Sequence, residues 1–174
     1  MRIKKTIFIL VISLLLWNCL KAKEQSSNRI APSFSLKELT GKKVILKDIK
    51  NKSVIIWFTN LCGGCQANMP TLEKMYKQYK KSVEILAISQ LGKDTVTVKK
   101  AVKELKITFP FLIDPDGKVC KLYSGEYVSN TCPLNNIYFI DKNGIIRDIS
   151  HYPGLSKEEL EGKIKILITG GIVK

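Results

Sequence analysis

Histidine and arginine are scarce in this 174-residue sequence, and lysine supplies most of its positive charge. There is one histidine, His151, and there are three arginines, Arg2, Arg29 and Arg147, although lysine and arginine together number 29 against 15 acidic residues. A nucleic-acid-binding face usually carries clustered arginines and stacking aromatic residues, and aromatics make up only 8% of this chain. We therefore expect no nucleic-acid partner. The lysines predict a solvated surface with a weak attraction to anionic membrane headgroups.

A long apolar run is also missing. The N-terminal run, Ile7 to Trp17, is broken only by Ser13 and has about half of the ~20 residues that a membrane-spanning helix needs. It follows three basic residues, as a secretory signal does, and ends beside Cys19. The segment resembles a bacterial lipobox with a lipidated cysteine, although Asn18 stands where a small residue is usual. The alternative is an uncleaved or differently cleaved signal in which Cys19 is incidental.

The chain therefore divides into a short N-terminal targeting segment and one domain. We expect a signal peptide with a lipobox at 1–19, a flexible polar tether at 20–29, a single domain at 30–169 and a tail at 170–174. The predicted location is extracytoplasmic, in the periplasm or on the outer face of a membrane, with the protein anchored as a lipoprotein. With 45% hydrophobic residues, the domain can form a packed core.

Hydrophobic patterning predicts an α/β fold with a mixed central sheet flanked by helices. Strand patterns occupy Val44–Leu46, Val54–Thr59, Val83–Ser89, Phe111–Ile113, Ile137–Ile140 and Ile145–Ile149, the last two joined by an Asn-Gly turn. Helical patterns run from Cys62 to about Tyr79, from a cap at Asp94 or Thr95, and from a Ser156–Glu159 capping box to about Ile168.

Cys62 and Cys65 form a C-x-x-C motif between a buried strand and a helix. This spacing lets two sulfurs meet within one helical turn. The free N–H groups and dipole at a helix N-terminus stabilise a thiolate at the first cysteine. Gly63 and Gly64 leave the approach open. We therefore expect Cys62 to be the attacking thiol and Cys65 the resolving thiol of a redox-active disulfide.

The spacing of the cysteines does not favour a closed zinc site. Such a site usually needs a second pair of similar spacing, and Cys120 and Cys132 do not form one, so we expect no metal. An inert C-x-x-C disulfide would be strained for little entropic gain. For Cys120 and Cys132 three hypotheses stay open: a structural disulfide, which we favour in an oxidising compartment, a second redox relay, or two buried thiols.

The stretch from Trp57 to Leu72, WFTNLCGGCQANMPTL, resembles the active-site segment of the TlpA/ResA-type thioredoxin-like family. The stretches Ala31–Leu36 with Gly41–Lys42, and Phe109–Asp114, are similar to its N-terminal hairpin and middle strand. The resemblance implies a thioredoxin-like fold with an added N-terminal β-hairpin. It also implies Trp57, Thr59 and Pro70 as supporting positions around the cysteines.

The family resemblance also implies a function. It is extracytoplasmic disulfide exchange with protein substrates, as a reductant in a role like cytochrome c maturation, with a membrane or extracytoplasmic electron donor. We expect a monomer with no cofactor besides the redox-active disulfide.

Two positions depart from the family pattern. A cis-proline usually faces the cysteines; counting back from Asp141 places that position at Asn135, and Pro133 is the nearest proline. Either Pro133 serves through a shifted register, which we favour, or the cis-proline is absent. A glutamate found in some reducing members is replaced by Asn68, which cannot titrate. We expect Glu73 to be a solvated helix charge.

Two rival functions share the residues of the motif. A peroxiredoxin-like peroxidase would explain the T-x-x-C formed by Thr59 and Cys62, but that pattern has a proline where Ile55 stands and needs an arginine, for which Arg147 is poorly placed. A copper(I) chaperone would use the paired thiolates with a nearby histidine, for which His151 is the only candidate.

Overall fold

The computed structural model describes residues 29–125 and 135–170. The predictions for the signal peptide, for lipidation of Cys19 and for most of the tether and tail fall outside these residues. The predictions for Cys132 and Pro133 also fall outside these residues. Within the described part, no helix combines the length and the apolar character needed to cross a membrane.

A seven-stranded mixed sheet runs through the centre of the described chain, in the order β2-β1-β5-β4-β3-β6-β7. Its strands are β1 Ser35–Glu38, β2 Lys43–Ile45, β3 Ser53–Thr59, β4 Val83–Ser89, β5 Phe111–Ile113, β6 Asn136–Ile140 and β7 Ile146–His151. Strands β3, β4 and β5 are parallel neighbours, and every other pair is antiparallel. The predicted mixed α/β sheet is confirmed, and so are the N-terminal hairpin of β1 with β2 and the C-terminal hairpin of β6 with β7.

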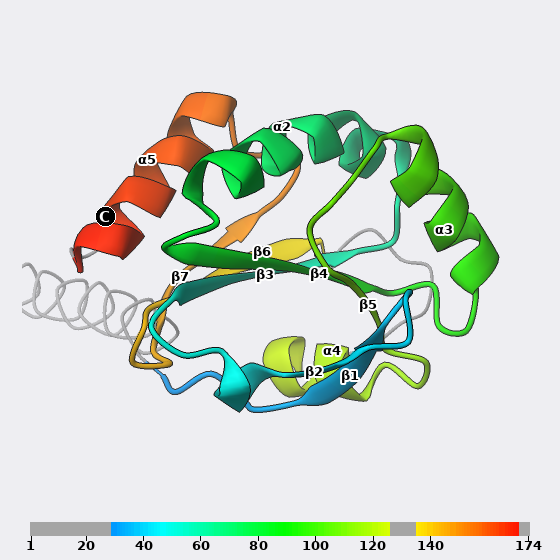
Figure 1. Cartoon of the computed structure of the whole chain (residues 1–174), viewed down its shortest axis with the longest axis horizontal. Coiled ribbons are helices and arrows are strands. Elements are labelled where there is room, and N and C mark those ends of the chain that lie inside the picture. The colour runs from blue at the N-terminus through cyan, green and yellow to red at the C-terminus, as the bar shows by residue number, and fades with distance from the viewer. Residues whose placement is uncertain (1–28, 126–134, 171–174) are drawn as a thin grey trace, which may run out of the picture.

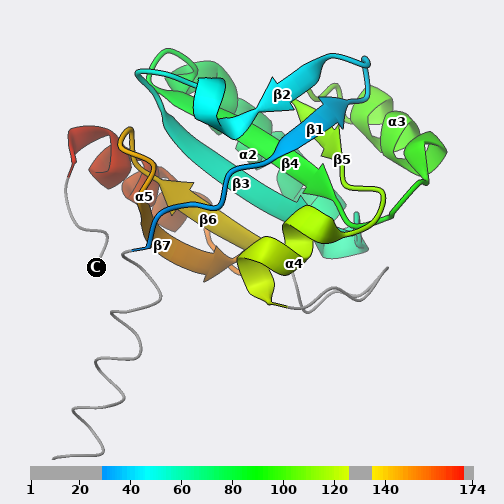
Figure 2. The same ribbon diagram turned by 90° about the horizontal axis from the view of Figure 1, so that it is seen from below.

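Helices cover both faces of the sheet (Figure 1). They are α2 Gly63–Tyr79, α3 Thr95–Glu104, α4 Lys118–Ser124 and α5 Lys157–Thr169, with one 3-10 turn, η1 Leu46–Asp48. Helices α2, α3 and α5 pack on one face around a core that includes Trp57 and Met69. The opposite face carries α4 and the chain that leads into β1 (Figure 2), around a core that includes Phe58 and Tyr123.

Local sequence signals explain where these elements begin. Every residue of β3 is buried, as its apolar run predicts for a central strand. The Asp94 side chain accepts a hydrogen bond from the Thr97 N–H and caps α3, and Ser156 with Glu159 forms the predicted capping box of α5. Both caps satisfy N–H groups that a helix leaves unpaired at its first turn.

The turn between β6 and β7 is organised by one carboxylate. Asp141 accepts hydrogen bonds from the N–H groups of Asn143 and Ile145, both at 2.9 Å. Gly144 takes the left-handed conformation, with φ 80°, that glycine adopts without steric cost. Since β3 and β6 are antiparallel, this turn lies at the end of the sheet opposite the carboxyl end of β3.

Candidate functional site

Cys62 and Cys65 lie where β3 passes into α2, as the sequence predicted. Cys62 is the residue that precedes the first turn of α2 and is half-buried, whereas Cys65 is fully buried in the core. The two Sγ atoms are 2.8 Å apart, a hydrogen-bonding contact between two thiols. A partly exposed sulfur at a helix N-terminus therefore stands directly over a buried one.

Side chains, rather than glycines, hold the turn that leads into the motif. Thr59 Oγ1 accepts a hydrogen bond from the Leu61 N–H at 3.0 Å, and Asn60 Oδ1 accepts one from the Cys62 N–H at 3.1 Å. Leu61 takes a left-handed backbone conformation, with φ 57°, which is uncommon for a residue with a side chain. These short-range bonds fix the backbone on which Cys62 stands.

Asn135 occupies the position at which the family resemblance places a proline, and it is fully buried. Its Oδ1 accepts a hydrogen bond from the Asn60 N–H at 3.2 Å. Its Nδ2 lies 3.7 Å from Cys62 Sγ and 3.4 Å from Asn60 Oδ1. A neutral amide therefore faces the first sulfur from the start of β6, while Pro133 lies outside the described residues.

The buried thiol of the pair holds its proton tightly. Burial and, to a smaller extent, the hydrogen bond with Cys62 raise the pKa of Cys65 to about 12, although a hydrogen bond with Thr59 lowers it. At neutral pH Cys65 is therefore a thiol, able to donate to Cys62 Sγ. Its Sγ also lies 3.7 Å from Asn60 Oδ1.

The segment after β7 packs against the motif, a contact that no local pattern predicts. Tyr152 is fully buried, and its ring meets Trp57 edge-on with centroids 5.4 Å apart. Its hydroxyl donates to the Asn68 carbonyl at 2.9 Å, its N–H donates to the Asn135 carbonyl at 2.8 Å, and its own carbonyl accepts from Trp57 Nε1 at 3.4 Å. Tyr152 thus contacts β3, α2 and the residue that precedes β6. Burial raises its pKa.

The two glycines of the motif have different surroundings. A methyl group added at Gly63 would meet nothing within 4 Å, but one added at Gly64 would come within 3.1 Å of the Pro153 ring. Gly63 therefore has space around it, whereas Gly64 is packed closely against Pro153; the open approach to Cys62 stays a prediction. Pro70 is exposed and lies inside α2.

Glu73 contradicts the prediction of a solvated charge, because it is only 5% exposed. Its carboxylate accepts hydrogen bonds from the Thr108 hydroxyl at 2.6 Å and the Thr108 N–H at 2.8 Å. Burial raises its pKa, but the Thr108 bonds and Lys77 outweigh burial and lower it. Glu73 fastens α2 to the loop before β5, a contact between residues 35 apart that local periodicity does not reveal.

The position of the family glutamate carries a neutral side chain. There the Asn68 side chain donates to the Gly64 carbonyl at 2.9 Å. Glu84 forms an ion pair with Lys52 at 2.9 Å, toward the amino end of β4. The contacts of the two sulfurs with Asn60 and Asn135 are with neutral amides.

Both arginines within the described residues form contacts with groups other than the two cysteines. Arg147 forms an ion pair with Asp141 at 2.8 Å, at the opposite end of the sheet, and Arg29 donates to the Tyr123 carbonyl at 2.6 Å. Ile55, which replaces the peroxidase proline, is a fully buried residue of β3. This geometry does not favour the peroxidase hypothesis.

His151 is exposed and ends β7, paired with Asn136. Within residues 29–125 and 135–170, no three His, Cys, Asp or Glu side chains come together as a set of metal ligands. The thiols and His151 are therefore not joined into the site that the copper hypothesis needs.

Cys120 belongs to α4 and is buried in the core on the other face of the sheet. Its Sγ accepts a hydrogen bond from Gln90 Nε2 at 3.4 Å and lies 3.8 Å from Ser124 Oγ. Burial raises its pKa. The disulfide with Cys132 stays a prediction, since Cys132 lies outside the described residues.

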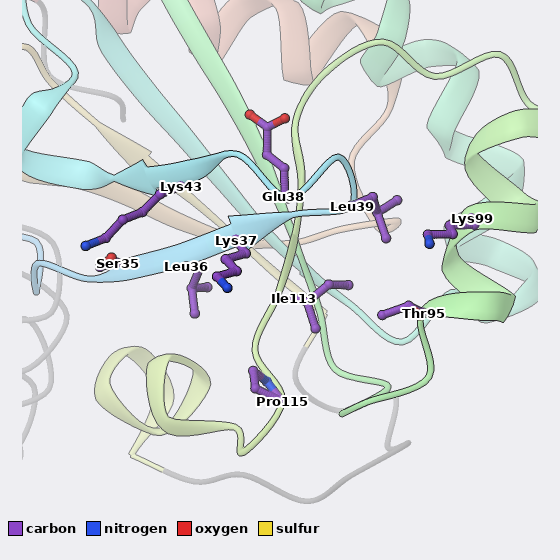
Figure 3. A pocket seen from close by; sticks show the side chains of 11 residues that line it. Ser35, Leu36, Lys37, Glu38, Leu39, Lys43, Thr95, Lys99, Ile113 and Pro115 are labelled. Carbon is purple, nitrogen blue, oxygen red and sulfur yellow. The ribbon is translucent and has the colours of Figure 1, made fainter.

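A cavity of about 590 Å³ opens between β1, β5 and α3, away from these cysteines (Figure 3). Leu36, Leu39, Ile113 and Pro115 contribute its apolar lining, and Lys37, Lys43 and Lys99 also line it. It contains neither cysteine of the motif nor a residue that bonds to them. This cavity and the half-buried Cys62 are therefore separate features of the described chain.

Comparison with known proteins agrees with this geometry. The AhpC/TSA family matches residues 28–149. The thiol-disulfide oxidoreductase ResA of Bacillus thuringiensis subsp. konkukian is 35% identical over 148 residues, which are 83% of this chain and 80% of that protein. The thioredoxin-like protein YneN of Bacillus subtilis is 33% identical and covers 78% of this chain and 77% of its own.

Solved structures show the same fold. A Chlorobium tepidum protein assigned as the thiol:disulfide interchange protein DsbE has a TM-score of 0.70 and 27% identity, covering 82% of this chain and 97% of that one. A secreted disulfide oxidoreductase of Mycobacterium tuberculosis has a TM-score of 0.65 and 21% identity, covering 77% and 96%. The second similarity concerns the fold alone.

Proposed function

We propose that this chain, which belongs to the AhpC/TSA family and is a thiol–disulfide oxidoreductase of the ResA type, exchanges disulfides with protein substrates outside the cytoplasm through Cys62 and Cys65. One observation carries the proposal. Cys62 stands half-buried at the N-terminus of α2, and its sulfur is 2.8 Å from that of the fully buried Cys65.

The reaction begins at the accessible sulfur. The Cys62 thiolate attacks one sulfur of a substrate disulfide, a mixed disulfide forms, and the other substrate sulfur leaves as a thiolate that takes up a proton. The helix N-terminus and the Asn135 amide stabilise the thiolate at Cys62, so we expect its pKa to lie below that of a free thiol.

Cys65 completes the exchange. It gives up its proton and attacks Cys62 Sγ, so that the Cys62–Cys65 disulfide forms and the second substrate thiol is released. Two electrons pass from the cysteine pair to the substrate, and an electron donor outside the cytoplasm must restore the dithiol. Because burial keeps Cys65 protonated, it attacks slowly until the mixed disulfide alters its surroundings.

The proposed direction is reduction of the substrate. A C-x-x-C pair becomes oxidising when its reduced form is strongly stabilised, and a positive charge beside the thiolate would do so. Here no lysine or arginine occurs from Ser53 to Leu72, or from Asn135 to Asp141. The contacts of the sulfurs with Asn60 and Asn135 are with neutral amides, which favours a reducing potential and a role like cytochrome c maturation.

The proposed location rests on the N-terminal sequence. The basic residues, the short apolar run and Cys19 are typical of a lipoprotein signal. We propose a monomer anchored on the outer side of a membrane. Fractionation with mass analysis of the N-terminal peptide tests this, and a mature N-terminus other than a diacylated Cys19 would contradict it.

The reduction potential of the pair tests the function. We expect the full-length protein, equilibrated in dithiothreitol redox buffers, to be half-reduced below about −230 mV, more reducing than glutaredoxins. In cells, Cys65→Ala should accumulate mixed disulfides with substrate proteins, whereas Cys62→Ala should accumulate none. A potential near −120 mV would assign the opposite direction, and no trapped species with Cys65→Ala would contradict disulfide exchange.

A further inference from the structure

The end of the sheet opposite the cysteines gathers several chain segments. β3 and β4 begin there, with Ser53 paired to Val83, and β6 ends there, with Ile140 paired to Val54. Cys62 follows the far end of β3. The seven residues of β3 separate the two ends by roughly 20 Å. In Figure 1 the described chain begins at the left, whereas α2 begins at the right.

Lysines surround a cavity of about 380 Å³ at this end. Lys47, Lys50 and Lys142 are exposed members of its lining, and Lys52 is held at the side by Glu84 at 2.9 Å. We call Ile30 and these four lysines the lysine face. Two more exposed lysines, Lys80 and Lys81, follow α2 just before β4 begins.

The one carboxylate in the lining of this cavity does not cancel the positive charge. Asp141 is 8% exposed, and its Oδ2 is 2.8 Å from the guanidinium of Arg147. Its Oδ1 accepts the N–H groups of Asn143 and Ile145. Since Arg147 neutralises Asp141, the exposed lysines give the face a net positive charge.

The chain from the N-terminus joins the domain at the same face. Ile30 pairs with Ile145, and the Ala31 N–H donates to the Gly144 carbonyl at 2.8 Å. The Ile30 side chain is 76% exposed beside the lysines. An exposed apolar side chain ringed by lysines is the composition of surfaces that lie on anionic membranes.

We propose that the lysine face rests on anionic phospholipid headgroups and turns Cys62 toward the side away from the bilayer. This inference rests on the proposed membrane anchor. Cys19 and Arg29 are ten positions apart, a reach of at most roughly 35 Å, so an anchored domain stays near the headgroups. One lipid anchor gains stable binding from a basic patch, and the two together fix one orientation.

Lysine footprinting on vesicles tests the orientation. The full-length protein is added to preformed vesicles of phosphatidylcholine, with or without phosphatidylglycerol, and exposed lysines are acetylated with an impermeant reagent before mass spectrometry. We expect phosphatidylglycerol to reduce acetylation of Lys47, Lys50 and Lys142 at least about five-fold, the effect of roughly one surface lysine. Lys99 and Lys103 of α3 should change little, and 0.5 M salt should abolish the difference.

Charge reversal supplies the matched variants. K50E with K142E should lose the protection of Lys47, whereas K99E with K103E should keep it. Equal acetylation of the lysine face and α3 on both vesicle types would overturn the inference, as would uniform protection of all lysines. Flotation with neutral vesicles tests the anchor separately: flotation only with anionic vesicles would contradict the anchor and support the lysine face, and no flotation with either would contradict both.

Discussion

Cys65 and Cys120 are both buried thiols, but they lie in the cores on opposite faces of the sheet. Burial raises the pKa of each. Cys65 has Cys62 Sγ 2.8 Å away at a helix N-terminus, whereas the N–H of Cys120 donates to the Asp114 carboxylate at 2.9 Å. Cys65 therefore has a half-buried partner sulfur at a helix N-terminus, whereas the described contacts of Cys120 are with Asp114, Gln90 and Ser124.

One residue connects the two regions. The Gln90 N–H donates to the Thr59 carbonyl at 2.8 Å, beside the motif, and its side chain donates to Cys120 Sγ at 3.4 Å. Gln90, which directly follows β4, therefore contacts both the end of β3 and the buried cysteine of α4. The following experiments ask whether function follows this division between the faces.

Replacing a cysteine on each face of the sheet should give the largest difference in turnover. We expect Cys62→Ser to reduce the turnover of a disulfide substrate by at least about 10³-fold, because the attacking atom is lost. Cys120→Ser should change turnover less than about three-fold, since that sulfur is buried in the core on the other face of the sheet. Steady-state assays of both variants check this, and equal losses would show that Cys120 takes part in the exchange.

Alkylation rates should separate the thiols next. In the fully reduced protein at pH 7 we expect iodoacetamide to modify Cys62 at least about 100-fold faster than Cys65 or Cys120, because only Cys62 is accessible and stabilised as a thiolate. Since the pKa of Cys65 is about 12, its rate should rise tenfold per pH unit throughout the measurable range. Time-resolved mass spectrometry checks both statements; a Cys65 rate that levels off near pH 8 would contradict the second.

The Asn135 amide should have an intermediate effect. We expect Asn135→Ala to raise the pKa of Cys62 by about one unit and to slow turnover roughly tenfold, because the donor at 3.7 Å is lost. Asn68→Ala is the matched control, since that amide bonds the Gly64 carbonyl. If both variants shift the alkylation profile equally, Asn135 has no special role.

Two buried carboxylates should respond to acid with opposite signs. The lowered pKa of Glu73 means that its stabilising effect is present above pH 4.5 and is lost as the pH falls below that value. Burial raises the pKa of Asp114, so its protonated form is favoured and its effect is lost as pH rises through the folded pKa. Glu73→Gln should therefore reduce the acid sensitivity of the free energy of unfolding, and Asp114→Asn should increase it.

Urea unfolding at pH 7 gives the size of the Glu73 contribution. We expect Glu73→Ala to cost about 1–3 kcal/mol, because it removes the charged acceptor of both Thr108 hydrogen bonds. Glu104→Ala, whose side chain is 61% exposed in its pair with Lys100, should cost less than about 0.5 kcal/mol. Equal costs would mean that Glu73 acts as a surface charge.

The two glycines should give the smallest difference. Gly63→Ala should be neutral or stabilise by less than about 1 kcal/mol, since the added methyl meets open space and alanine is less free in the unfolded chain. Gly64→Ala must displace the Pro153 ring at 3.1 Å and should destabilise instead. Thermal unfolding of both variants checks the sign of each effect.

Local patterns in the sequence were sufficient for most of the fold. The strand Val83–Ser89 has the predicted bounds, and the capping box places the start of α5, because periodicity and capping depend on nearby residues. Glu73 was misjudged because its partner Thr108 is 35 residues away. The roles of Asn60 and Tyr152 were missed; an asparagine two residues before Cys62 was an available signal for the turn, whereas nothing local marked Tyr152.

The left-handed backbone at Leu61 has a consequence for anyone who would transplant the reactive loop. Glycine would relax that conformation but would empty a place in the core, because the leucine is only 5% exposed. The side-chain hydrogen bonds of Thr59 and Asn60 hold the backbone in this conformation while the leucine side chain stays in the core. The portable unit is thus the seven-residue stretch Thr59–Cys65 together with an amide at position 135, and grafting the four residues CGGC alone onto another strand–helix junction should give an ordinary pair of cysteines.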